Sequence, residues 1–233
     1  MKRFLPMLSW FALGLGTYGW AAEPPLPKFE AQTIDGKVAI GYGVAIGDVD
    51  GDGKPDILLA DKREIAWYRN GDWKKFVMAA DLTPHDDVCI AARDIHGDRR
   101  VEVAVGANWN WHGNTLVVYT PSGQGGPWQR SVLADDLGEG HGLACADFLG
   151  LGSDQVIVGW RNPNAQKKVG IRLYVPPDFP GSPWKSHVID DNTMACEDLK
   201  VADLDGDGRP EIIASGRSTH NLVIYWNRTG MKK

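Results

Sequence analysis

Two short loops carry carboxylates at a spacing suited to a metal ion. In residues 48–56 and 203–211, acidic side chains occupy positions one, three, five and nine, and glycine occupies positions four and six. Alternate carboxylates on a tight loop converge on one point and repel one another unless a cation lies between them. Ca²⁺ takes six to eight oxygen ligands, which side chains, the carbonyl at position seven and water would supply. The predicted ligands are Asp48, Asp50, Asp52, Lys54 and Asp56 in one loop, and Asp203, Asp205, Asp207, Arg209 and Glu211 in the other.

Two other kinds of loop share part of this pattern. An EF-hand needs a bidentate Glu at position twelve and a following helix. Position twelve is Leu59 in one loop and Ala214 in the other, and both follow strand-like runs, so the EF-hand is excluded. An ordinary Asp-Gly turn is the second alternative, and it gives no reason for four carboxylates at this spacing.

Two further segments, 94–102 and 147–155, repeat the pattern incompletely. Asp94, Asp98 and Glu102 remain in the first, where His96 replaces an acid and Arg99 replaces a glycine. A third Ca²⁺ site at these three acids is therefore left open. In 147–155 only the leading acid remains, and no site is expected there.

The four loops belong to a repeat that organises the chain. Their leading Asp residues lie 46, 53 and 56 positions apart, within the range of propeller blades. Each loop stands between two apolar runs rich in Val and Ile, and a third run with Tyr and a fourth led by an aromatic residue follow, as expected of strands. The prediction is an all-β, four-bladed β-propeller with four antiparallel strands per blade.

The last repeat has no fourth run, and its counterpart stands at the start of the chain. Residues 29–35 match residues 184–190, and Ile34 and Ile189 both lie 14 positions before the next leading Asp. We therefore expect the N-terminal strand to close the ring by completing the last blade, which would remove the open sheet edges. An incomplete ring that dimerises into eight blades is the alternative.

The N-terminus predicts export. Lys2 and Arg3 precede an apolar stretch that ends in small residues, so residues 1–21 are predicted to be a signal peptide and 22–233 a single propeller domain. The expected location is secreted or periplasmic, without membrane insertion. The net charge of −5 excludes nucleic acid as a partner. Three cysteines, Cys89, Cys145 and Cys196, leave at least one thiol outside any intrachain disulfide, and their pairing stays open.

The motif Asp-x-Asp-x-Asp-Gly-x-x-Asp/Glu between two apolar strands resembles the FG-GAP/VCBS repeat family of integrin α heads, in its secreted bacterial form. The resemblance covers residues 28–227. It implies a propeller with structural calcium, but no single activity, because such propellers serve as adhesion heads, lectin-like modules and scaffolds of sugar-active enzymes.

The face opposite the calcium loops collects the residues suited to a ligand. Aromatic, arginine and histidine side chains in its loops suit sugars, which stack on rings and exchange hydrogen bonds. The candidate binding residues are Trp109, Trp111, His112, Trp160, Arg161, Arg217 and His220. The strand starts at the mouth of the channel add further polar groups, Tyr42, Asp86, Asp87, Glu139, His141, Glu197 and Asp198.

Two classes of function follow. The first is a non-catalytic module that binds a glycan or an extracellular protein. The second is a sugar-active enzyme, a polysaccharide lyase or sugar dehydratase, with His141, Tyr42 and Glu197 as candidate acid and base. No complete catalytic motif is present, which favours binding, and no catalytic residue is assigned.

Overall fold

The computed structural model describes residues 27–81, 86–108, 114–122, 127–178 and 182–230. The chain divides into two compact units, Met1–Ile34 and Asp35–Lys233. In the first unit, residues 27–34 contain no strand, whereas every described strand lies in the second unit. In these ranges no helix has the length and apolar character needed to cross a membrane.

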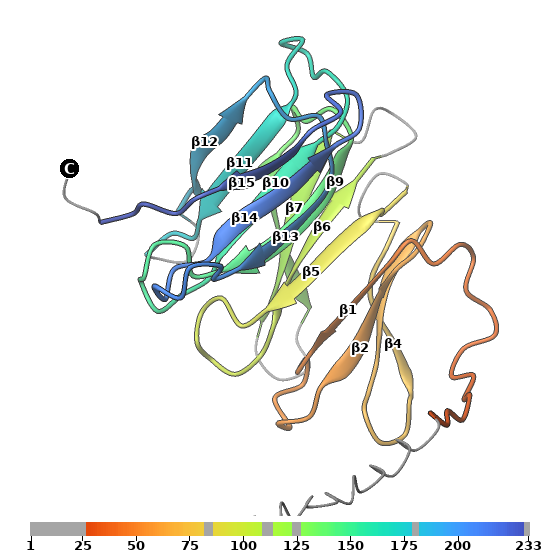
Figure 1. Ribbon diagram of the computed structural model, residues 1–233. Helices are drawn as coiled ribbons and strands as arrows, with labels where there is room; N and C mark the ends of the chain where they lie inside the picture. The colour runs from red at the N-terminus through yellow and green to blue at the C-terminus, as the bar shows by residue number, and fades with distance from the viewer. Residues whose placement is uncertain (1–26, 82–85, 109–113, 123–126, 179–181, 231–233) are drawn as a thin grey trace, which may run out of the picture. The chain divides into compact units, whose positions relative to one another are not determined.

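The second unit consists of four antiparallel sheets in which each strand pairs with the next one in sequence (Figure 1). The first sheet contains β1 (Gly43–Gly47), β2 (Asp56–Ala60), β3 (Glu64–Tyr68) and β4 (Lys75–Ala80). The second contains β5 (Cys89–Arg93), β6 (Glu102–Ala107), β7 (Thr115–Pro121) and β8 (Trp128–Ala134). The third contains β9 (Gly140–Ala146), β10 (Gln155–Trp160), β11 (Gly170–Val175) and β12 (Lys185–Asp191), and the fourth β13 (Cys196–Ala202), β14 (Glu211–Gly216) and β15 (Leu222–Tyr225).

The second strand of each sheet is deeply buried. All six residues of β6 and all six of β10 are buried, which explains their continuous runs of Val, Ile and Ala. The outer strands β8 and β12 are mostly exposed and carry more polar residues. Burial on both faces of the second strand requires that neighbouring sheets pack face to face.

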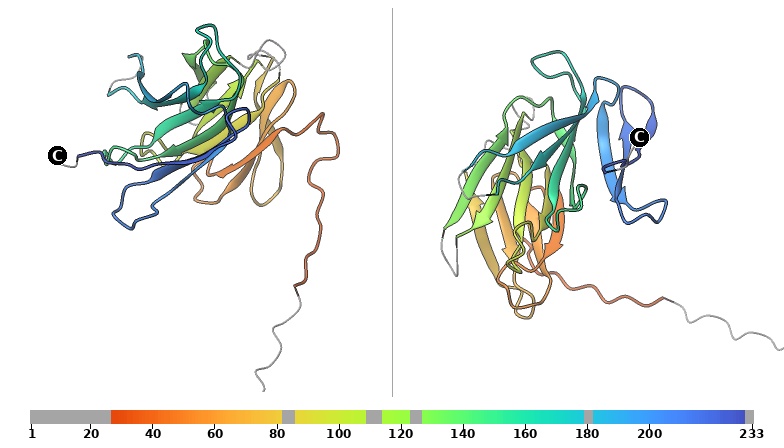
Figure 2. Two further views of the ribbon diagram at one scale, coloured as in Figure 1. Left: turned by 45° about the horizontal axis from the view of Figure 1, so that its top comes forward. Right: turned by 90° about the vertical axis from the view of Figure 1, so that its left-hand side faces the viewer.

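Three apolar cores join the four sheets in series. The first holds Leu58 and Trp67 of the first sheet together with Val103 and Tyr119 of the second. The other two cores join the second sheet to the third and the third to the fourth. The first strands follow the same order, since β5 packs between β1 and β9, and β9 packs on β13. In the described part of the chain no comparable packing links β1 to β13. Figure 2 shows the series from two further sides, with the fourth sheet in blue.

The predicted all-β fold with four antiparallel sheets as propeller blades is confirmed. The predicted closing strand is not found. The fourth sheet has three strands in the described ranges, residues 27–34 form none, and Phe29 is 94% exposed. Closure of the ring is thus not detected, since within the described residues β15 pairs only with β14.

Candidate functional site

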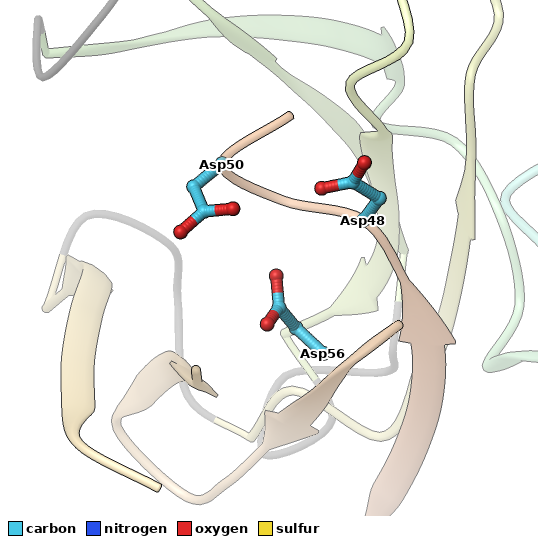
Figure 3. Close-up of side chains that lie close together, drawn as sticks. All are labelled: Asp48, Asp50 and Asp56. Atoms are coloured by element: carbon cyan, nitrogen blue, oxygen red, sulfur yellow. The ribbon is translucent and has the colours of Figure 1, made fainter. Parts of the chain in front are cut away.

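Two groups of three acidic residues lie on the predicted calcium loops. They are Asp48, Asp50 and Asp56 after β1, and Asp203, Asp205 and Glu211 after β13. In each group one carboxylate oxygen from each residue lies within 4.8 Å of the other two. Figure 3 shows the first group, whose carboxylates face a common space.

The leading Asp of each loop organises the backbone around it. Asp48 accepts hydrogen bonds from the N–H groups of Gly51 at 2.7 Å and Gly53 at 2.8 Å. Both glycines have positive φ, at 80° and 84°, a region that L-residues with side chains rarely adopt. Asp147, which leads the loop without the other acids, accepts bonds from Leu151 and Gly152 in the same way. The shape of the loop therefore follows from its first residue and does not need the other carboxylates.

Position nine of each loop is buried and fastens the loop to its own start. Asp56 accepts a 2.9 Å hydrogen bond from the N–H of Val49, and Asn70 donates to its other oxygen. The equivalent side chains accept backbone N–H bonds in the other loops: Glu102 from Ile95, Gln155 from Leu149 and Glu211 from Leu204. This role was not predicted from the sequence, where position nine counted only as a ligand. The recurrence of an apolar residue at position two was the available signal.

The donor set of the complete loops fits a hard cation. Burial raises the pKa of Asp56, and although the N–H bonds of Asn70 and Val49 lower it, the charges of Asp50 and Asp52 raise it further. A cation among these oxygens would relieve that repulsion. Three carboxylate oxygens within 4.8 Å of one another match the spread of ligands around an ion bound at 2.3–2.6 Å.

Position five does not take part in these groups. The carboxylate of Asp52 contacts the ammonium of Lys54 at 2.8 Å, and that of Asp207 pairs with the guanidinium of Arg209. Both acids were predicted as ligands. In this structure their charge is directed to the side chain at position seven.

The second loop is organised around a histidine. His96 Nδ1 lies 2.9 Å from Oε1 of Glu102, and this hydrogen bond raises the pKa of His96 against the effect of burial. Asp94 accepts N–H bonds from Gly97, Asp98 and Arg99. An imidazolium would place a positive charge beside Glu102, where the two complete loops have Asp50 and Asp205 at position three.

A chain of ion pairs lies at the opposite end of the third and fourth sheets. Arg161, directly after β10, contacts Glu139 at 2.7 Å and Glu197 at 3.2 Å. Arg217, directly after β14, reaches the same oxygen of Glu197 at 3.5 Å. The backbone N–H of Arg161 also donates to the carbonyl oxygen of Glu139. The structure thus brings together four of the residues predicted for this face, and we call them the arginine–glutamate cluster.

Two further predicted residues meet between the first and second sheets. Burial raises the pKa of Tyr42, and the charge of Asp86 and a hydrogen bond to it raise the pKa further. Asp86 is only 7% exposed, and its Oδ1 atom is buried without a hydrogen-bond partner in the described ranges. Because this oxygen is enclosed by the protein, it is not presented to a ligand at the surface.

The remaining predicted binding residues divide into three groups. Trp160 must be corrected: it is 3% exposed in the second core and donates its indole N–H to the carbonyl of Lys168, so its ring cannot stack on a ligand. His220 is exposed. Trp109, Trp111 and His112 lie outside the described residues.

The three cysteines are free thiols. Cys145 and Cys196 are buried and Cys89 is partly buried, and burial raises the pKa of each to about 12. Thiols in this state are poor nucleophiles and act as small apolar side chains.

Comparison with known proteins supports the repeat and the fold. Residues 48–105 match the family described as FG-GAP-like repeat, which confirms the resemblance over this part of the chain. No curated protein sequence matches the chain.

Solved structures similar to this one include the following two. A chain in the crystal structure of a nidogen/laminin complex matches with a TM-score of 0.55 and 14% identity, over 80% of this chain and 60% of that one. An Agrocybe aegerita lectin that recognises non-reducing terminal N-acetylglucosamine matches with a TM-score of 0.47 and 17% identity, over 78% of this chain and 51% of that one. The present chain therefore spans less than two thirds of either relative. The match to nidogen supports the propeller fold.

Proposed function

We propose that this FG-GAP-repeat β-propeller is a secreted or periplasmic calcium-binding module that binds a glycan or protein ligand, without catalysis, through the face opposite its calcium loops. The observation that carries the proposal is the arginine–glutamate cluster at that face. The acidic loops lie at the other end of the sheets, because antiparallel strands place the loops after β9 and β10 at opposite ends.

The two acidic triads support the calcium part of the proposal. Extracellular calcium modules bind with dissociation constants of about 10⁻⁴ to 10⁻³ M, which suits a compartment outside the cytoplasm. Calcium at these loops would hold the ends of the first and second strands and so stabilise the blade that carries each loop. Its role would be structural, since no residue of the ligand face belongs to a triad.

The chemistry of the ligand face suits a ligand with several hydroxyl groups. The Arg217 side chain is 62% exposed, so its remaining N–H groups are available to accepting oxygens. Glu197 is 36% exposed and can accept from hydroxyl donors. Paired donors and acceptors of this kind recognise vicinal hydroxyl groups of a sugar.

The contacts of the candidate acid and base favour binding over catalysis. Glu197 is ion-paired to Arg161 and Arg217, so its carboxylate is already in contact with two guanidinium groups. The raised pKa of Tyr42 opposes its use as a base. The third candidate, His141, is tested by the assay for unsaturated ends.

The proposal is tested by glycan-array binding of the full chain, with and without calcium, beside Arg217→Ala. This variant should lose binding, whereas Arg69→Ala, an ion-paired arginine on the calcium-loop face, should keep it. Incubation with acidic polysaccharides should give no new ultraviolet-absorbing unsaturated ends. If such ends form in the parent and not in a variant that lacks the His141 side chain, the protein is a lyase and the proposal of a non-catalytic module is wrong. Equal binding by the parent and Arg217→Ala would show that the ligand does not bind at the arginine–glutamate cluster.

A further inference from the structure

The outer strand of the fourth sheet has an edge and a face without a partner in the described part of the chain. In the other three sheets the third strand pairs on both sides, but β15 pairs only with β14. Its side chains Leu222 and Ile224 are 74% and 41% exposed, and Trp226 beside them is 45% exposed. An open edge with apolar side chains favours the addition of another strand.

Among the described residues, the core between the third and fourth sheets has no aromatic residue at the start of an outer strand of its second sheet, whereas the other two cores each have one. Trp128, at the start of β8, packs against the core between the first and second sheets, and Trp184, next to β12, packs against the following core. No residue of an outer strand in the fourth sheet does so at the third core in the described ranges. A cavity of about 280 Å³ lies there instead, lined by Ile189, Tyr225 and Trp226 among others.

The position of Asp35 indicates which sequence belongs beside β15. Near the end of β12, Asp190 accepts a 3.0 Å hydrogen bond from the hydroxyl of Tyr225 in the next sheet. Asp35 accepts the equivalent bond from Tyr68 in the first sheet at 2.7 Å. Since residues 29–35 match residues 184–190, the segment before Asp35 has the sequence of an outer strand from a preceding sheet. Its leading aromatic residue, the counterpart of Trp184, is Phe29.

The first sheet presents an apolar surface at the other end of the series. Val44 and Ile46 of β1 are 69% and 61% exposed. The first and fourth sheets are the two ends of the series (Figures 1 and 2), and β1 does not pack against β13 as the other first strands pack on their neighbours. Each end thus exposes apolar side chains, whereas the corresponding side chains of the interior sheets are buried against a neighbouring sheet.

We propose that a second copy of this chain covers these ends. Residues 29–34 of each copy add to the edge of β15 in the other, Phe29 enters the cavity beside Trp226, and the end at Val44 and Ile46 covers the face at Ile224. A two-fold axis makes the exchange reciprocal, so that two copies satisfy both open edges at once. The product has eight sheets, within the range of propeller blades.

The expected register provides a test. Leu173 pairs with His187 in the third sheet, and the sequence match makes Ile224 the counterpart of Leu173 and Gln32 that of His187. Full-length Gln32→Cys and Ile224→Cys should therefore form an interchain disulfide when mixed and oxidised, while neither variant should do so alone. The three native thiols are buried or partly buried. The parent protein, oxidised in the same way, is the control for any disulfide that these native thiols form.

The mass in solution gives a second measurement. Light scattering should give twice the mass of one chain for the parent. Ile224→Glu should raise the dissociation constant of the pair about tenfold or more, because it buries a charge. The matched change Leu151→Glu, at a residue 61% exposed on a calcium-side loop, should leave the pair intact. A monomeric parent overturns the proposal, and so does an intrachain disulfide that forms only in the double variant, which would show that the chain closes on itself.

Discussion

The hydroxyl of Tyr68 donates a 2.7 Å hydrogen bond to the carboxylate of Asp35, which stands 33 positions earlier in the chain. Lys75 lies 3.1 Å from the same carboxylate and 2.7 Å from that of Glu64. Tyr225 and Asp190 repeat the tyrosine–carboxylate pair in the fourth sheet. This contact therefore fastens the segment before a sheet to the third strand of that sheet.

The Asp35 contact predicts a pH-dependent part of the stability. Hydrogen bonds from Tyr68, the backbone of Lys37 and Lys75 lower the pKa of Asp35 from 3.8 to about 2. Because the folded pKa is lower than the unfolded one, the stabilisation is complete above about pH 4 and is lost as the pH falls toward 2. Asp35→Asn should be less stable than the parent at pH 6, and the difference should shrink steadily below pH 4.

Urea denaturation of the parent and Asp35→Asn across this range measures the effect. Tyr68→Phe is the matched variant, since it removes the first of the three hydrogen bonds and should give the same trend with a smaller amplitude. A difference between parent and Asp35→Asn that stays constant from pH 6 to pH 2.5 would contradict the assigned interaction.

The sheets could be predicted from the sequence because burial of a strand restricts which residue types it can contain. β6 and β10 are buried along their whole length, and all their residues after the leading Glu102 and Gln155 are apolar, as positions buried on both faces favour. The acidic loops were equally readable, since Asp and Gly recur at fixed spacing. The match between residues 29–35 and 184–190 also identified the segment before Asp35 as a candidate outer strand. A sequence match does not say whether that segment would join the fourth sheet of its own chain or that of a second chain.

The ligand face was harder to predict because partners distant in sequence decide what a residue does. Trp160 follows the last apolar residues of a strand and suggests an exposed ring, yet the fold turns it into the core beneath Arg172. Arg161 was assigned to the ligand face, but its pairing with Glu139 and Glu197 depends on how β9, β10 and β13 align. Register between strands is set by packing and turns, which a single sequence does not specify.

Calcium should raise the melting temperature of the full chain. With a dissociation constant of about 10⁻⁴ M, 1 mM calcium would add about 1.4 kcal/mol per site, or about 3–6 °C for a domain of this size. Asp50→Ala and Asp205→Ala should each remove part of the rise. Leu149→Ala and Asp191→Asn, which change no triad, should keep the full rise. An unchanged melting curve after addition of chelator would show that the loops bind no calcium.

Arg99→Gly should stabilise the protein. Arg99 has φ of +70° at the loop position where Gly53 and Gly208 have φ of 84° and 83°. A left-handed conformation costs a residue with a side chain about 1–2 kcal/mol, and glycine removes most of that cost. The reverse change Gly53→Ala should destabilise by a similar amount, because a Cβ atom there meets nothing within 4 Å and only the backbone conformation is penalised. Thermal unfolding without calcium compares the two, and a loss of stability in Arg99→Gly would mean that the arginine side chain outweighs the backbone strain.

Substitutions at position nine should distinguish its structural role from its role as a metal ligand. Glu211 accepts a 2.8 Å hydrogen bond from the N–H of Leu204 and is fully buried. Gln155 accepts a similar bond with an amide oxygen, from the N–H of Leu149 one position further along the third loop, so fastening the loop in this way does not require a charge.

Glu211→Gln should consequently keep most of the calcium-free stability, while the calcium-dependent rise in melting temperature from its loop should be lost. Glu211→Ala should lose both, with a cost of about 1–3 kcal/mol for the buried N–H left without an acceptor. Gln155→Ala should show the structural cost alone, since its loop lacks the other carboxylates. Melting curves of the three variants, each with and without calcium, make the comparison. If Glu211→Gln retains the full calcium-dependent rise in melting temperature, Glu211 is not a calcium ligand and has only a structural role. Calcium at this loop would then be bound by Asp203 and Asp205.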